Sequence, residues 1–379
     1  DTLHRALDLA NGKGASLGNL DAFSELCEET GKTPFFAFLG APPLLQHLPS
    51  QLFAAEASGL PDIDALALGL DVSPPGFVER LALHTRGPRR GFLAWMDPLP
   101  LARPLPGAVP DRLLSFFQAR IPPGKTLDDA LRTLKGIQSP TDHAGLLESL
   151  EGIRRNCGFD LRGDLLQSLG ETVTLTLAKG QDPARPDLVC AWTLADPAGC
   201  LSCVERALAT LDQHEEAAPF RRRWVEGAEV FVADPEGWNA VLSRPYPRGT
   251  PPFAFGVVRG NLVVASRPEL VARHGRGTQL PPAMGTALEA LPERAWAVSC
   301  ADSRAVLNQL GDALQVHGVP LPPALAGFLQ SDVPLPPAVA ALTSTPRCVV
   351  LESRGPLPLV TAALAGIGME LTLPTPLRE

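Results

Sequence analysis

The sequence predicts an α+β protein built from duplicated units of mostly antiparallel sheet, with helices packed on one face. Short apolar segments, several of them alternating with polar residues, are joined by turns rich in glycine and proline. Helical patterns stand between the strands, and a similar order of elements returns near both ends of the chain. The 379 residues include 40 prolines and 34 glycines, a composition typical of many short elements.

The first copy of the repeat begins with a helix that contains residues 21–26. The apolar run 35–39 predicts a strand, and the leucines within 44–48 predict a second helix. An antiparallel hairpin is expected next, with strands over 83–88 and 91–96 and a turn made by glycine and proline.

The second copy shows the same order near the end of the chain. A helix is expected at 287–291, a strand at 295–300 and a second helix around 306–310. The sequence Leu-Glu-Ser-Arg-Gly-Pro at 351–356 and the apolar run 359–364 match the hairpin of the first copy. We therefore expect an internal duplication.

The repeat divides the chain into three expected segments. Residues 1–110 form a first α+β repeat unit, 111–280 a central α+β block and 281–379 a second α+β repeat unit. Within the outer segments, the duplicated parts extend over about 20–97 and about 284–373.

The central block predicts strands connected by turns, with helices inserted between them. Asp160–Leu169 has helical spacing, and Asp196 followed by Pro197 predicts a helix start, because Asp caps a helix and Pro is tolerated in its first turn. Residues 259–261 predict a turn, and Pro268 begins another helix. Strands are expected at 171–178, 188–194, 224–232, 253–258 and 262–265.

The charge pattern argues against a nucleic-acid partner. The chain has a net charge of −8 and a pI near 5.5, and it lacks the basic stripe of such proteins. Its densest basic run, Arg221–Arg223, stands near Glu215 and Glu216 and is expected to be a solvated face or the entry of a strand.

The chain begins at Asp1 instead of Met, as expected of a processed or trimmed product. The longest apolar stretch near the end, 357–369, contains Pro358 and is too short to span a bilayer. We expect a soluble piece whose proximity to a membrane would depend on a segment absent from this chain.

Cysteines supply the only motif with chemical content. Cys200 and Cys203 follow a strand and open a helix, whose N–H groups and dipole lower a thiol pKa. The pair is therefore an alternative redox site, with Cys200 as nucleophile and Cys203 as resolving thiol. A local disulfide and two incidental cysteines are the other interpretations. Three further cysteines in apolar runs are expected in the core: Cys190, Cys300 and Cys348.

No other catalytic site, no cofactor and no metal site is expected. The seven histidines are widely spread, without the close spacing of metal ligands. Gly12–Ser16 lacks the spacing of a phosphate-binding loop, and Asp160 and Asp164 are expected to stabilise a helix N-terminus. Six aromatic residues are expected as core anchors: Phe35, Phe36, Phe38, Trp95, Trp192 and Trp296.

Several of these segments together resemble a known family. They are 158–166, the Asp196-Pro197-Ala198 step, the strand 260–266, and the helix 287–291 that leads to Trp296. In this order they are similar to bacterial envelope-associated proteins of unknown function. The resemblance implies a signal peptide or N-terminal anchor, a periplasmic or cell-surface location and no known activity. Cys200 and Cys203 depart from the family pattern.

These observations favour a non-enzymatic envelope scaffold or binding protein, whose partner is an unknown protein or an apolar ligand. A thiol-disulfide oxidoreductase at Cys200 and Cys203 is the alternative. A hydrolase whose residues converge only in three dimensions is a third hypothesis.

Overall fold

The computed structural model describes residues 20–40, 59, 62–74, 76–96, 100–101, 110, 112–182, 185–211, 220–235, 253–277, 279–318, 320, 326–327, 329, 331 and 333–357. The chain forms two compact units. Unit 1 comprises residues 1–98, 132–137 and 340–379, and unit 2 comprises residues 99–131 and 138–339. The three segments and the duplication expected from the sequence stay predictions.

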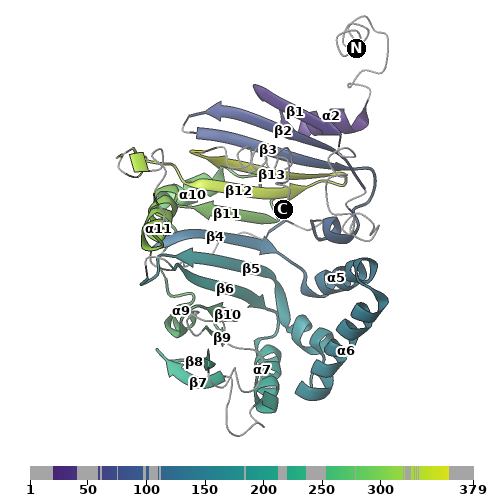
Figure 1. Cartoon of the computed structure of the whole chain (residues 1–379), viewed down its shortest axis with the longest axis vertical. Coiled ribbons are helices and arrows are strands. Elements are labelled where there is room, and N and C mark those ends of the chain that lie inside the picture. The colour runs from purple at the N-terminus through teal and green to yellow at the C-terminus, as the bar shows by residue number, and fades with distance from the viewer. Residues whose placement is uncertain are drawn as a thin grey trace, which may run out of the picture. The chain divides into compact units, whose positions relative to one another are not determined.

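Unit 1 contains a sheet with the helix α2 packed on one face (Figure 1). Its strands are arranged in the order β1-β2-β3-β13-β12. The long hairpin of β2 and β3 pairs in antiparallel fashion with β1 on one side and β13 on the other. The elements are α2 (Asp21–Thr30), β1 (Phe35–Gly40), β2 (Ile63–Ser73), β3 (Gly76–Thr85), β12 (Ala338–Ser344) and β13 (Cys348–Gly355).

Small residues let α2 lie close to this sheet. Beneath Leu26, the buried side chains are mostly alanines, including Ala67 and Ala82. At Gly69, a Cβ atom would lie 3.0–3.2 Å from Thr33 and Thr30, so the glycine permits the close approach of the helix end.

Among the described residues, unit 2 has eight strands in the order β11-β4-β5-β6-β10-β9-β8-β7 (Figure 1). Every neighbouring pair in this order is antiparallel. The strands are β4 (Leu113–Arg120), β5 (Leu169–Ala178), β6 (Asp187–Leu194), β7 (Phe220–Val225), β8 (Ala228–Ala233), β9 (Ala254–Val258), β10 (Asn261–Ala265) and β11 (Ala297–Ala301). The expected α+β class with antiparallel sheet is therefore confirmed.

Helices complete the element order. They are η4 (Gly91–Met96), α5 (Pro123–Ile137), α6 (Pro140–Cys157), η5 (Leu161–Leu166), α7 (Pro197–Leu211), α9 (Pro268–Arg273), α10 (Pro282–Glu289) and α11 (Ser303–Val316). The helix start predicted at Asp196 is confirmed, since its side chain accepts a hydrogen bond from the Gly199 N–H at 3.0 Å. Asp160 likewise caps η5 by accepting from the Gly163 N–H, and the Asp164 carboxylate accepts from the Asp160 N–H.

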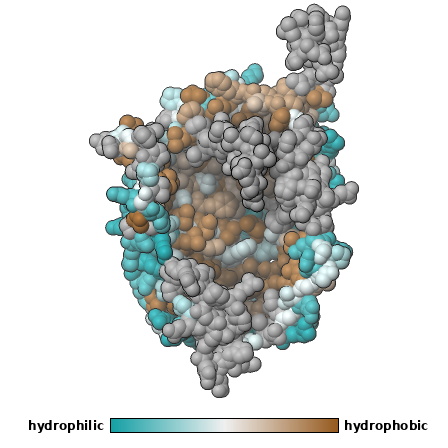
Figure 2. Space-filling view, viewed as in Figure 1, coloured by the Kyte–Doolittle hydropathy of each residue, from teal (hydrophilic) through white to brown (hydrophobic). Residues whose placement is uncertain are grey.

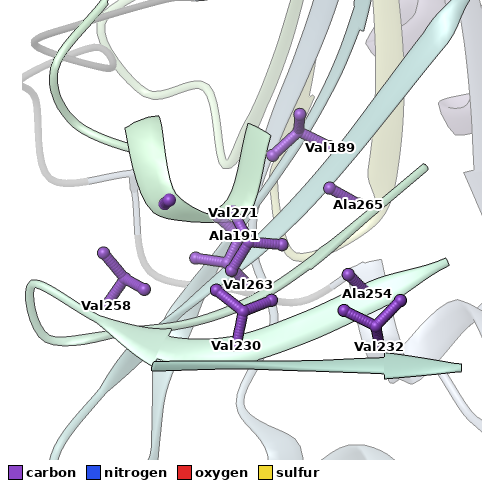
Figure 3. Packing of buried hydrophobic residues seen from close by; sticks show 10 residues of the cluster. Val189, Ala191, Val230, Val232, Ala254, Val258, Val263, Ala265 and Val271 are labelled. Carbon is purple, nitrogen blue, oxygen red and sulfur yellow. The ribbon is translucent and has the colours of Figure 1, made fainter. Parts of the chain in front are cut away.

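The valine-rich core of unit 2 lies between strands β6, β8, β9 and β10 and the short helix α9 (Figure 3). Val230, Val263 and Val271 are completely buried there. Gly256 keeps the backbone of β9 close to this core, because an added Cβ would lie 2.8 Å from the carbonyl oxygen of Glu229. One face of these strands is therefore sealed by α9.

Two hairpins of unit 2 turn through left-handed residue pairs. Arg259 and Gly260 have φ angles of 50° and 74°, which confirms the turn predicted at 259–261. Glu226 and Gly227 have φ angles of 48° and 79°. The single strand predicted at 224–232 is therefore wrong: this turn divides the segment into the hairpin of β7 and β8.

Other expectations need correction. Residues 91–96 form the 3-10 helix η4 instead of a strand, and Leu93 packs against Ile63. The helix predicted to continue to Leu169 ends earlier, because Leu169 already begins β5. The helix predicted at 44–48 and the strand at 359–364 lie outside the described residues.

Candidate functional site

The strongest candidate for a binding surface is the face of the unit 2 sheet opposite α9. Leu175 of β5 lies directly across from Cys190 of β6, and Cys190 lies across from Val264 of β10. Successive side chains of a strand point to opposite faces, so these three share a face that Val263 and Val189 do not. We call this surface the apolar face. Its members on β4, β5, β6, β9 and β10 are Phe117, Val173, Leu175, Leu177, Leu188, Cys190, Trp192, Phe255, Val257, Leu262 and Val264.

The apolar face exposes large side chains in the middle of the sheet. Leu175 is 37%, Leu188 41% and Val264 39% exposed. None of the face's residues carries a charge, and the indole N–H of Trp192 donates to the carbonyl of Gly170 at 2.6 Å. Figure 2 shows apolar residues gathered over β4, β5 and β6, where the surface is hollowed. Contiguous apolar surface of this kind marks binding sites.

The sequence predicted the alternation of β5 but not which side is exposed. Leu175 faces outward, whereas Thr176 is buried. On the threonine side, the side-chain amide of Gln118 on β4 donates to the Thr174 hydroxyl at 3.2 Å. The alternation in the sequence thus predicts that one side of β5 is apolar, but it does not predict that this side is the exposed one.

Aromatic rings end the apolar face toward the sheet edge. Phe231 and Phe255 are stacked with centroids 5.2 Å apart, and Phe220 meets Phe255 edge-on at 5.1 Å. The guanidinium of Arg222 lies 5.5 Å from the Phe231 ring and pairs with Glu229 at 3.0 Å. The predicted solvated face at Arg221–Arg223 is confirmed for Arg221 and Arg222, whose side chains are exposed and paired with carboxylates.

The Cys200 and Cys203 pair lies away from the surface. Both are free thiols and both are fully buried near the start of α7. Burial raises the pKa of the Cys200 thiol, with smaller effects of a lowering hydrogen bond from Ser168 and raising charges at Cys203 and Asp196. This direction is opposite to the lowering expected at a helix start, and the redox role of the pair stays a prediction.

A polar cleft of about 620 Å³ lies beside α9 in unit 2. Its Ser266 hydroxyl is engaged, since it donates to Asp187 and accepts from the Leu188 N–H. Asp234 at its edge pairs with Arg221 at 2.7 Å. The described lining residues of the cleft include the carboxylates of Asp234 and Glu269 and no histidine. Gly14–Gly18 has the spacing Gly-x-Ser-x-Gly of a nucleophile turn, and it lies outside the described residues.

Unit 1 holds a second candidate site. The spacing of its residues in the sequence did not predict it. His84 of β3 is buried, with its Nδ1 2.6 Å from Oδ1 of Asp64 and its Nε2 3.2 Å from Oε2 of Glu25. Cys348 of β13 is the direct cross-strand partner of His84. Donor atoms of Glu25, His84 and Cys348 all lie within 4.8 Å of one another. We call these four residues the His84 cluster.

Charges around the His84 cluster are balanced by arginines. Arg347 pairs with Oε1 of Glu25 at 3.0 Å, and Arg86 lies 3.9 Å from Asp64. Burial raises the pKa of Cys348 to about 12, and the negative charges of Glu29 and Glu25 add to this. The expected core position of Cys348 is confirmed, as is that of Cys300, whose pKa burial also raises to about 12. Cys190 is half-buried instead.

The expected aromatic core anchors divide into two groups. Trp296 is buried and Phe38 packs against the core beneath α2, which confirms both. Phe35 and Phe36 are 61% and 39% exposed, so the prediction is wrong for them. They lie on β1, for which β2 is the only strand partner among the described residues. The described part of the chain does not include the Trp95 side chain.

Comparisons with known proteins assign no family. No family model matches the chain, and no curated protein matches it. Among solved structures, crystal form I of the Treponema protein TP0453 matches with a TM-score of 0.29 and 9% identity, over 64% of this chain and 75% of that one. Crystal form III matches with a TM-score of 0.30 and 8% identity, over 70% and 99%. Similarity of this size leaves family and activity unassigned.

The described helices include none with the length and apolar character needed to cross a membrane.

Proposed function

We propose that this protein is a non-enzymatic binding protein of the bacterial envelope, which holds an apolar ligand with a hydrocarbon chain against the apolar face of unit 2. The observation that carries the proposal is the uncharged patch formed by Leu175, Leu188 and Val264 in the middle of a sheet. The opposite face of β6 and β10 packs into the valine-rich core beneath α9, so Val264 and Leu188 are exposed on the other side of these strands.

Strand pairing favours a hydrocarbon ligand over an extended peptide. A peptide that adds to a sheet needs a free edge with unpaired backbone groups. Strands β5, β6 and β10 each have a paired neighbour on both sides, so their backbone groups are engaged. Only side chains face the ligand, and these are apolar.

The energetics suit the same ligand. Burying apolar area contributes roughly 25 cal/mol per Å², or about 0.8 kcal/mol for each methylene group removed from water. The apolar face carries no charged side chain whose desolvation would offset this gain. A long hydrocarbon chain can therefore bind by contact alone, without a polar anchor on the face.

The envelope location is the less direct part of the proposal. It is supported by the resemblance of residues 158–166, 196–198 and 260–266 to envelope-associated proteins. An envelope supplies hydrocarbon ligands in the form of lipids. Fractionation of the native host, with detection of this chain in the cytoplasmic fraction alone, would remove this part while leaving the binding proposal standing.

A titration of the full chain with a fluorescent long-chain fatty acid tests the binding proposal. Leu175→Asp is expected to weaken binding by about 10-fold or more, because it replaces apolar contact with a charge. Leu147→Asp is the matched control, since Leu147 is also exposed, at 46%, but belongs to α6 and not to the strands of the apolar face. Equal affinity of the two variants, or no binding by the unaltered protein, would overturn the proposal.

A further inference from the structure

We propose that the His84 cluster of unit 1 is a zinc site, in which Glu25, His84 and Cys348 bind the ion and Asp64 positions the imidazole. The proposal is independent of the apolar face, since every residue of the cluster belongs to unit 1. It rests on the convergence of four side chains from α2, β2, β3 and β13.

Sheet register places the imidazole and the thiol together. His84 and Cys348 are directly opposite in the antiparallel pair of β3 and β13. Opposite residues of such a pair have Cβ atoms about 5 Å apart on the same face. Both side chains lie beneath α2, which brings Glu25 down onto them.

A β-bulge in β2 positions Asp64, the fourth residue of the His84 cluster, next to His84. The register of β2 and β3 shifts between Ile63 and Ala65, so that Asp64 is the extra residue on β2. Without the shift, Asp64 would point to the opposite face from Ala65. The bulge turns its carboxylate toward Nδ1 of His84 instead, and bulges commonly re-aim a side chain in this way.

The donor set selects the metal. Thiolate, imidazole and carboxylate together are typical of zinc, whereas magnesium and calcium take oxygen ligands. Glu25, His84 and Cys348 supply three donors, which leaves a fourth position for water or another ligand. The contact of Asp64 with Nδ1 leaves Nε2 as the metal-binding nitrogen, the arrangement in which a carboxylate orients a zinc-bound histidine.

Distances and charges are compatible with binding. Tetrahedral zinc holds its ligand atoms roughly 3.5 Å apart, so donor atoms within 4.8 Å must approach by about 1 Å. Glu25 can supply this movement because its side chain is partly exposed, with Oε2 facing His84 while Arg347 holds Oε1. The Cys348 thiol loses its proton to solvent on binding, and the thiolate and the Glu25 carboxylate then neutralise the ion.

A purely structural ion-pair network is the competing explanation. In it, a charged His84 bridges Asp64 and Glu25, and Cys348 is only a core residue. The two explanations differ in the role of the sulfur, because only the zinc site requires a bond to Cys348.

The direct test titrates the chelator-treated full chain with Co²⁺ and then with Zn²⁺. We expect one ion per chain, a thiolate-to-cobalt charge-transfer absorption band, and loss of that band when zinc displaces cobalt. Cys348→Ser should abolish the band, and Glu25→Gln and Asp64→Asn should each weaken zinc binding by about 10- to 100-fold. Glu25 lies partly exposed, so its variant is expected to fold.

Cys300→Ser is the matched control, since Cys300 is an equally buried free thiol that belongs to unit 2. It should keep the cobalt band and the zinc affinity of the unaltered protein. Absence of the band in the unaltered protein, or an equal band in Cys348→Ser with circular dichroism unchanged, would overturn the zinc site in favour of the ion-pair network.

Discussion

In unit 1, the face of the sheet beneath α2 holds charged groups beside its small apolar side chains, whereas in unit 2 the face without α9 exposes apolar ones. Beneath α2 lie His84 and the Arg80–Glu352 pair, whose atoms are 2.8 Å apart. On the apolar face of unit 2, Leu175 and Val264 are exposed instead. Each unit thus departs from the simple arrangement of apolar residues inside and polar residues outside, and such departures mark functional sites.

The two departures differ in their free-energy cost to the folded protein. A buried charge is retained only when partners compensate it, so the polar groups of unit 1 must form a network. An exposed apolar side chain costs little in the folded state, so the apolar face of unit 2 can be altered without loss of the fold.

The largest effect is expected from a pair of neighbouring valines on β10. Val263→Asp should destabilise the protein by about 4 kcal/mol or more, because it buries an unpaired carboxylate in the core beneath α9. Val264→Asp, on the apolar face, should change the free energy of unfolding by less than about 0.5 kcal/mol. Urea unfolding followed by circular dichroism measures both. Similar losses for the two variants would show that the apolar face is packed like a core.

His84→Ala tests the compensation in unit 1. Removal of the imidazole leaves the carboxylates of Asp64 and Glu25 without the group between them, and we expect a loss of about 3 kcal/mol in the presence of a chelator. His317→Ala serves as the control, because His317 is exposed at the end of α11. A loss below about 0.5 kcal/mol for His84→Ala, comparable to surface changes, would contradict the compensating network.

The smallest effect concerns His274, a half-buried histidine of unit 2. Burial lowers the pKa of His274, and the charge of Arg259 lowers it further. A folded-state pKa below the unfolded value of about 6.5 means that the unfolded chain binds more protons, so this contribution is present above that pH and is lost as the pH falls.

His274→Gln should therefore flatten the decline in stability between pH 7 and pH 5, measured by urea unfolding at several pH values. An unchanged slope in the variant would show that His274 titrates alike in the folded and unfolded states.

Helix starts and turns could be predicted from the sequence because they depend on interactions between adjacent residues. Asp196 before Pro197 begins a helix, and Arg259-Gly260 turns a hairpin, since capping and left-handed φ angles depend on adjacent residues. The same holds for the strand at 171–178. The sequence also indicated an apolar side for this strand, because leucines alternate with threonines there.

Properties set by strand pairing could not be read in this way. Phe35 and Phe36 look like core residues, but the exposure of β1 depends on which strands pair with it. The His84 cluster needs the register of β3 with β13 and a bulge in β2, neither of which leaves a spacing in the sequence. Histidines judged by sequence spacing alone gave no sign of it.

The most direct test of the apolar face is photo-crosslinking with a fatty acid that carries a photoreactive group in its hydrocarbon chain. After irradiation of the full chain, digestion and mass spectrometry locate the attachment. We predict attachment within β5, β6 and β10, at peptides containing Leu175, Leu188 or Val264, with loss of this signal in Leu175→Asp. Attachment confined to other parts of the chain, or equal labelling of every exposed leucine, would contradict the binding role of this face.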